Sequence, residues 1–139
     1  MKITGGCHCG NIHYSAEIDP NKVILCHCTD CQKMSGSPYR GVVIATDETF
    51  QMTGQIKDYI KETANSGNPR AQSFCPDCGT HIYATSTGEM PEGTPRVYNI
   101  RLGTTQQRDE LTPTIEIWAN SRQPWIDAVE GAAQIPEQP

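Results

Sequence analysis

The sequence lacks long apolar runs and is poor in apolar residues throughout. Only 36% of its 139 residues are apolar, and the mean hydropathy is -0.54. No stretch approaches the roughly 18 apolar residues of a membrane-spanning helix, so we expect no membrane partner. The first ten residues also lack the apolar run of a signal peptide, which predicts a cytoplasmic protein. Such a composition predicts a modest core that needs support besides burial.

Positive charge is scarce too. Eleven Lys and Arg stand against 16 Asp and Glu, for a formal net charge of -5 at pH 7. This balance argues against a nucleic-acid partner held through its phosphates and suits a small-molecule ligand better. A glycine-rich phosphate loop and a Ser-His-Asp order are also missing, which leaves nucleotide binding and serine hydrolysis without support.

What is present predicts one compact domain over residues 1–139, built of short strands and turns. Apolar and polar residues alternate over 12–17, 97–102 and 115–118, and in the second segment Tyr98, Ile100 and Leu102 are predicted to face the core. Residues 42–45 suit a strand buried on both faces, and 56–64 favour a strand over a helix. A short helical turn is expected at 30–34, and loops at 65–69 and 89–95.

Cysteine is the one chemically distinctive residue in abundance, with seven copies. They form three groups: Cys7-x-Cys9, Cys26-x-Cys28-x-x-Cys31 and Cys75-x-x-Cys78. A disulfide framework is disfavoured because the number is odd and nothing marks the chain as secreted. In a reducing compartment such groups indicate metal binding or redox chemistry.

The last group is typical of a zinc knuckle. Cys75 and Cys78 flank a tight turn, and the Gly79 that follows allows a positive backbone φ. Cys7 and Cys9 stand at positions i and i+2 of a strand, so both sulfurs can face one ion. We predict that these four cysteines hold a structural zinc that clamps the N-terminal strand to a distant hairpin.

The middle group suggests a second zinc with an open position. Cys26 and Cys28 share a face, Cys31 can reach back from the first turn of a helix, and three protein ligands are typical of catalytic zinc. A closed structural site, with a fourth ligand from His27, His81, Asp30 or water, is the alternative. His27 itself should point away from its neighbours, as a donor behind the site or an exposed residue.

Other candidates are weaker. We expect His8 and His13 at the surface, His81 as a satisfied structural residue, and Trp118 and Trp125 in the core, with Trp125 alternatively at a pocket rim. An anionic ligand at the open zinc would need a cation nearby. Each cation that could serve is expected to be ordinary surface charge instead: Lys33, Arg40, Arg101 and Arg122.

Taken together, these motifs resemble the glutathione-dependent formaldehyde-activating enzyme family, which includes the centromere protein V type of domain. The likeness is carried by residues 6–10, 26–33 and 74–80, with support from 115–118 and 124–125. It implies an all-β fold of stacked antiparallel sheets, the β-tent shared with Rab-chaperone-like and methionine sulfoxide reductase B domains. One departure, at residues 104–108, leaves substrate recognition open.

The resemblance also implies roles for the cysteines. Cys7, Cys9, Cys75 and Cys78 match the family's structural zinc, and Cys26, Cys28 and Cys31 match its catalytic zinc, so two zinc ions per chain are expected. Residues 35–39 match the loop that helps to form the family's pocket. The implied substrates are a thiol such as glutathione and a small aldehyde such as formaldehyde.

Two functions remain open at this stage. The first is a carbon-sulfur lyase that joins or separates the thiol and the aldehyde, since a zinc with three thiolates suits a soft sulfur ligand better than activated water. The second is a non-catalytic zinc module that binds thiols or a protein partner. Reductase chemistry of the methionine sulfoxide type lacks a free cysteine once all seven bind metal.

Overall fold

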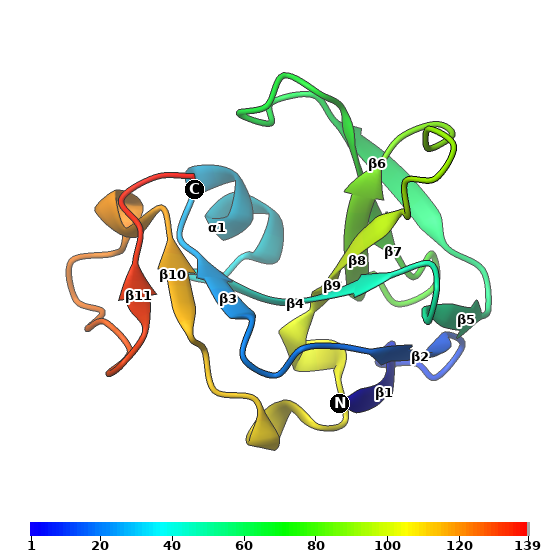
Figure 1. Ribbon diagram of the computed structural model, residues 1–139, viewed down its shortest axis with the longest axis horizontal. Helices are drawn as coiled ribbons and strands as arrows, with labels where there is room; N and C mark the ends of the chain where they lie inside the picture. Colours follow the sequence, from blue (N-terminus) through cyan, green and yellow to red (C-terminus); the bar gives the residue numbers. More distant parts are fainter. Residues whose placement is uncertain (139) are drawn as a thin grey trace.

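The computed structural model describes residues 1–138 and consists mostly of β-strands in two sheets (Figure 1). The smaller sheet has the order β1-β2-β5, and its strands are β1 (Lys2–Gly6), β2 (His13–Glu17) and β5 (Gln51–Thr53). The larger sheet has the order β11-β10-β3-β4-β9-β8-β7-β6. Its strands are β3 (Val23–Cys26), β4 (Arg40–Thr46), β6 (Lys57–Lys61), β7 (Arg70–Phe74), β8 (His81–Ser86), β9 (Val97–Arg101), β10 (Ile115–Ile117) and β11 (Ala133–Gln134).

Helical structure is limited to short segments. The α-helix α1 (Thr29–Ser35) confirms the helical turn expected at 30–34, and it ends at Gly36, whose φ of 63° is a left-handed helix stop. Three single turns of 3₁₀ helix are η1 (Leu102–Thr104), η2 (Arg108–Glu110) and η3 (Ala119–Ser121). None of the helices within residues 1–138 is long and apolar enough to cross a membrane.

The strand predictions are confirmed, including the ambiguous segment 56–64, which forms β6. The predicted all-β fold of two sheets is confirmed with them. One detail was not foreseen: β10 pairs parallel with β3 and with β11, whereas the other strand pairs are antiparallel. The parallel pairing follows from a long connection that returns the chain to β3, and alternation within a strand carries no sign of its direction.

The two faces of the large sheet have different characters. Side chains of Val43, Ala45 and Ile100 lie on one face and pack with residues of the small sheet, among them Ile3 and Tyr14. Tyr98 and Leu102 pack against this core as predicted. Successive side chains in a strand point to opposite faces, so the other face carries the intervening residues.

That second face is where the polar groups gather. Cys26, Arg40 and Arg101 from β3, β4 and β9 line a pocket on it together with Val42. Residues 42–45 are thus buried on both faces of β4, as predicted: Val43 lies in the core, and Val42 is 7% exposed beside the pocket. In Figure 1, α1 and the loop between β6 and β7 lie on the same side of β3 and β4. The ion pair between Asp30 of α1 and Lys61 at the end of β6 joins them at 3.0 Å.

We predict that Ile100→Ala will lower the free energy of unfolding by about 2–5 kcal/mol, since its side chain is fully buried in the core and deletion leaves a cavity. Urea unfolding followed by tryptophan fluorescence measures the loss. The matched control is Ile60→Ala on β6, where the side chain is 44% exposed and the cost should stay below about 1 kcal/mol. Equal losses in both variants would contradict this placement of the core.

Candidate metal centres and the pocket beside them

The structure brings four of the cysteines together from two distant turns. Cys7 and Cys9 follow β1, Cys75 and Cys78 form the turn between β7 and β8, and their sulfurs all lie within 4.8 Å of one another. The Sγ atoms of Cys7 and Cys9 are 3.5 Å apart, and those of Cys9 and Cys75 are 3.7 Å apart. Sulfurs bound to one tetrahedral ion at about 2.3 Å would be about 3.8 Å apart, so this cluster fits a closed four-sulfur metal site.

Local backbone geometry explains the β7–β8 turn. The Gly79 amide donates to the Cys75 carbonyl at 2.8 Å, and the Cys75 amide donates to the Thr80 carbonyl at 2.9 Å. Gly79 has a φ of 77°, the positive value for which the sequence provides glycine. The Asn11 amide group donates to the Asp77 carboxylate at 2.7 Å, which ties the two cysteine turns together outside the sulfurs.

Hydrogen bonds from outside the cluster favour the thiolate form of two of these sulfurs, those of Cys7 and Cys78. The Thr80 hydroxyl, 3.2 Å from the Cys78 sulfur, and backbone amides nearby lower the pKa of Cys78 to about 5. The Ile12 amide donates to the Cys7 sulfur at 3.2 Å. Since the thiolate is the metal-binding form of cysteine, these groups prepare the cluster for a cation.

The other three cysteines meet where β3 passes into α1. Cys26 ends β3, Cys28 caps the helix, and Cys31 lies in its first turn, with all three sulfurs within 4.8 Å of one another. The Cys31 amide donates to the Cys28 sulfur at 3.3 Å. Contacts from the Cys26 and Cys31 thiols lower the pKa of Cys28 to about 2, and contacts from Cys28 and Cys31 raise the pKa of Cys26. The cluster therefore carries negative charge at neutral pH and can hold a metal ion with three sulfur ligands.

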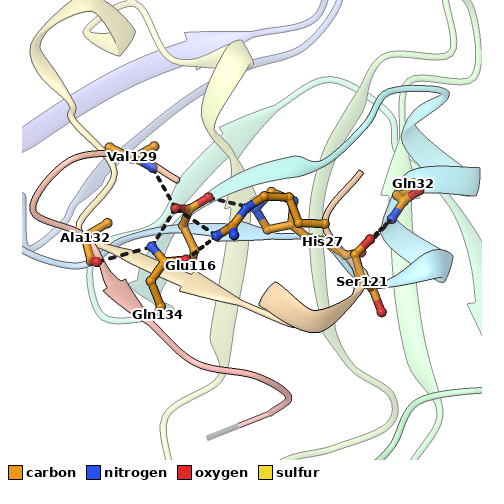
Figure 2. A network of polar contacts seen from close by, with 8 residues as sticks. His27, Gln32, Glu116, Ser121, Val129, Ala132 and Gln134 are labelled. Carbon is orange, nitrogen blue, oxygen red and sulfur yellow. Dashed lines mark hydrogen bonds and ion pairs between the residues drawn. The ribbon is translucent and has the colours of Figure 1, made fainter. Parts of the chain in front are cut away.

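His27 points away from this cluster, as predicted, but it is not exposed. Its side chain is fully buried, and Nε2 lies 2.8 Å from the Glu116 carboxylate (Figure 2). The backbone carbonyl of His27 accepts a hydrogen bond from the Gln32 amide group at 2.7 Å, and the same group donates to the Ser121 carbonyl at 3.0 Å. His27 and Gln32 thus anchor the cysteine segment from behind.

Glu116 is the centre of this anchoring network. It is 1% exposed, and one carboxylate oxygen accepts hydrogen bonds from the Val129 amide and the Gln134 side chain while Arg122 lies 3.3 Å away (Figure 2). Burial opposes its charge, but the hydrogen bonds from Gln134, His27 and Val129 lower the pKa of Glu116 below its usual 4.5. The network joins β3, β10 and β11, the strands beneath the three-cysteine cluster.

The three-cysteine cluster opens into a cavity of about 570 Å³ on the polar face of the large sheet. Four cations and one carboxylate line the cavity: Arg40, Lys61, Arg70, Arg101 and Asp30. Asp30 is engaged by Lys61 at 3.0 Å and by the Thr63 hydroxyl at 2.7 Å, which closes one side between α1 and the β6–β7 loop. By contrast, the four-cysteine cluster does not line this cavity.

The positions of several predicted residues need correction. Arg40 and Arg101, expected to be ordinary surface charge, are only 6% and 8% exposed. Their strands place them on the face that α1 and the β6–β7 loop cover. Lys33 is exposed, and Arg122 pairs with Glu116. Neither lines the cavity.

The aromatic predictions also fail in part. Trp125 is 72% exposed and belongs neither to the core nor to the cavity lining, because its loop continues beyond the sheet. Trp118 lines the cavity with a left-handed backbone, φ 54°, and its indole donates to the Gln138 side chain. Residues 35–39 do not line the cavity; Tyr39 instead stacks edge-on against His27 at 5.5 Å.

The histidine predictions hold with one exception. His8 and His13 are exposed. His81 stacks on Phe74 at 5.9 Å, but its buried Nδ1 has no hydrogen-bond partner within residues 1–138. It is therefore structural without being fully satisfied.

Sequence reasoning missed Lys61, Arg70, Gln72 and Glu116. In the β6–β7 hairpin Lys61 stands opposite Arg70, and Gln72 follows two residues later on β7. The three therefore share the cavity face, a signal that strand periodicity could have revealed. Nothing in the local sequence marks Glu116, because its partners come from residues 27, 122, 129 and 134.

Comparison with known proteins agrees with this description. The family model described as "Glutathione-dependent formaldehyde-activating enzyme" matches residues 2–121. A Schizosaccharomyces pombe protein named as an uncharacterized lyase is 32% identical over an alignment of 93 residues, and the match covers 63% of this chain. The match spans 61% of that relative's length. A Rhodobacter sphaeroides crystal structure covers 74% of this chain and 87% of its own, with a TM-score of 0.54 at 17% identity, and so shows likeness of fold alone.

We predict that Glu116→Ala will lower the free energy of unfolding by about 3 kcal/mol or more, because Arg122 loses its buried counter-charge and the buried His27 Nε2 loses its hydrogen-bond partner. The substitution should also remove the hydrogen bond that holds Gln134 of β11 to Glu116, so that amide hydrogen exchange around Ala133 accelerates. The control is Glu110→Ala at an exposed position of η2. Unchanged stability and exchange in Glu116→Ala would contradict the role given to this network.

The same carboxylate should make stability depend on pH. Folding lowers the pKa of Glu116 below its ordinary value of 4.5. The ionised carboxylate therefore adds its full contribution to the free energy of unfolding above pH 4.5, and this contribution is lost as the pH falls through the folded-state pKa. The stability difference between wild type and Glu116→Gln should therefore be constant above pH 4.5 and shrink below it. Urea unfolding of both proteins at a series of pH values measures that difference, and a difference that grows in acid would contradict the pairing.

Proposed function

The chain belongs to the glutathione-dependent formaldehyde-activating enzyme family, and from this premise we propose that it is a zinc-dependent carbon-sulfur lyase. Its substrate is the adduct of a glutathione-like thiol and a small aldehyde such as formaldehyde, as in an S-(hydroxymethyl)glutathione synthase. The lyase named among its relatives supports the same class of reaction. The observation that carries the proposal is a cluster of three cysteine sulfurs at the wall of a cavity lined by cations.

The two clusters take different roles in this proposal. Cys7, Cys9, Cys75 and Cys78 bind a structural zinc, because four sulfurs complete a tetrahedron and the cluster lies outside the cavity. Cys26, Cys28 and Cys31 bind a catalytic zinc, because three sulfurs leave a fourth position and the cluster lines the cavity. When bound there, zinc supplies a site that favours a soft sulfur ligand in its thiolate form.

The protein's own residues then shape the reaction space. The Asp30–Lys61 pair and Thr63 hold the β6–β7 loop against α1, which limits the access of water from that side. The substrate thiol first loses its proton to water, and its sulfur then bonds to the aldehyde carbon. The carbonyl π electrons move to oxygen, and that oxygen takes a proton from water to complete the hydroxymethyl adduct. The reverse reaction breaks the same carbon-sulfur bond. Positive charge from Arg40 and Arg101 in the cavity wall favours an anionic sulfur there.

A thiol-reductase mechanism has less support. All seven cysteines are free thiols that belong to one cluster or the other. With every sulfur used as a ligand, none is left as a redox nucleophile. So many free thiols also need reducing conditions, which supports the proposal of a cytoplasmic location.

The purified protein should contain two zinc ions per chain. Cys28→Ser should retain about one zinc and a folded core, whereas Cys78→Ser should lose the clamp between the two distant turns and unfold at a lower temperature. Elemental analysis and thermal unfolding measure the two effects. If Cys28→Ser destabilises the fold as strongly as Cys78→Ser, the three-cysteine site is structural and the proposed chemistry loses its basis.

Catalysis should appear as faster exchange between free glutathione and its formaldehyde adduct. Two-dimensional NMR exchange spectroscopy with equimolar glutathione and formaldehyde measures the rate with and without protein. Wild type should accelerate the exchange about 10-fold or more, as expected for a positioned nucleophile, and Cys28→Ser should not. Lys33→Gln, an exposed α1 position outside the cavity, is the control with full activity. Rates that equal the uncatalysed one at high protein concentration would favour the non-catalytic thiol-binding module.

A further inference from the structure

Two buried guanidinium groups lie beside the three-cysteine cluster without a carboxylate partner. In the β3–β4 register Arg40 stands opposite Cys26, and in the β4–β9 register Arg101 stands opposite Val42. Both line the cavity, with exposures of 6% for Arg40 and 8% for Arg101. Within residues 1–138 neither takes part in an ion pair. Burying an unpaired charge is costly, so this arrangement calls for an explanation.

The two groups converge on one neutral acceptor. Arg40 Nη1 donates to the side-chain oxygen of Gln72 at 3.3 Å, and Arg101 Nη2 donates to the same oxygen at 2.6 Å. Gln72 is itself 4% exposed, so it fixes both side chains in the wall. In the described part of the chain, Arg40 Nη2 and Arg101 Nε remain buried donors with no acceptor.

The charges on this face do not balance without a ligand. Three thiolates on a divalent ion leave one net negative charge, against two positive charges from Arg40 and Arg101. Arg70 adds a third, and in the described part of the chain its side chain bonds only the neutral side chains of Asn99 and Ser86. Within residues 1–138, Asp30 is the sole carboxylate of the cavity lining, and it already has Lys61 and Thr63 as partners. Over the described residues, one positive charge on this wall therefore stays uncompensated even when a substrate thiolate is counted with the three cysteines, so a further anion is missing.

We propose that Arg40 and Arg101 form a carboxylate-binding subsite beside the three-cysteine cluster, so that a ligand of this cavity carries a carboxylate. The subsite rests on the proposed function and deepens it by naming a chemical requirement of the substrate. Planar guanidinium groups match the two oxygens of a carboxylate, and both side chains line the cavity without a carboxylate partner within residues 1–138. The carboxylate can belong to the thiol, as in glutathione, or to the aldehyde, as in a 2-oxo acid such as glyoxylate.

Binding of probes without a thiol tests the subsite apart from catalysis. The first probe is the tripeptide γ-glutamyl-alanyl-glycine, which has the carboxylates of glutathione but no sulfur, and the second is glyoxylate. Isothermal titration calorimetry on the zinc-loaded protein compares each probe with its ester. At least one acid should bind about tenfold or more tighter than its ester, and the preference should weaken in high salt. The acid that shows the preference identifies the substrate that carries the carboxylate.

Variants assign the preference to residues. Arg101→Gln and Arg40→Gln should each weaken acid binding about tenfold or more while ester binding stays unchanged. Arg101→Lys keeps the positive charge but loses the paired N–H donors of the guanidinium group, so this variant should bind the acid with intermediate affinity. Arg108→Gln, an exposed position outside the cavity, should bind as wild type does. Circular dichroism and zinc content verify the fold of each variant.

The wild-type comparison needs no variant and can overturn the subsite by itself. If both acids bind no better than their esters, the arginines serve only to offset the thiolate charge. Loss of binding in Arg108→Gln equal to that in Arg101→Gln would also overturn the subsite. If the protein prefers an acid over its ester through the arginines but does not accelerate glutathione exchange, the carboxylate subsite is supported and the lyase function is contradicted. If the protein accelerates glutathione exchange but shows no preference for an acid over its ester, the lyase function is supported and the subsite is contradicted.

Discussion

The large sheet has to bury two unlike faces, and the rest of the structure depends on how it does so. Alternate residues of β4 and β9 are apolar on one face, where Val43 and Ile100 meet the small sheet. On the other face the same strands carry Arg40 and Arg101. Apolar side chains can seal the first face but not the second, because buried guanidinium groups need polar partners. Helix α1 and the β6–β7 loop cover the second face through polar contacts, and the cavity lies between them and the sheet.

Covalently distant segments are held together by polar and sulfur contacts rather than by a large core. The four-cysteine cluster joins the turn after β1 to the β7–β8 turn. The Glu116 network joins β3 to the C-terminal strands. In a chain with 36% apolar residues, such contacts add to the limited free energy from burial. The proposed structural zinc strengthens the first junction, because its binding free energy is available only to the folded chain.

Features that depend on neighbours in sequence were predictable. The helical turn after Cys28, the positive φ of Gly79 and the outward direction of His27 from the cluster all follow from local geometry. Features that depend on distant strands were not. Arg40 and Arg101 have the same local sequence signature whether their face is covered or open. Trp125 is apolar enough for a core, yet its loop leaves it exposed.

The sequence by itself determined which cysteines can present their sulfurs together within one turn or along one strand face, because their spacing decides this. It also determined that the chain forms an all-β fold, because alternation sets which residues each strand buries. The tertiary structure decided which strands are neighbours, and so which polar residues share one enclosed face. A buried charge is specified by what surrounds it in space, and the partners of Glu116, Arg40 and Arg101 come from segments far away along the chain. The cavity and its unpaired arginines are therefore properties of the fold, although the cysteines at its wall can be identified from the sequence.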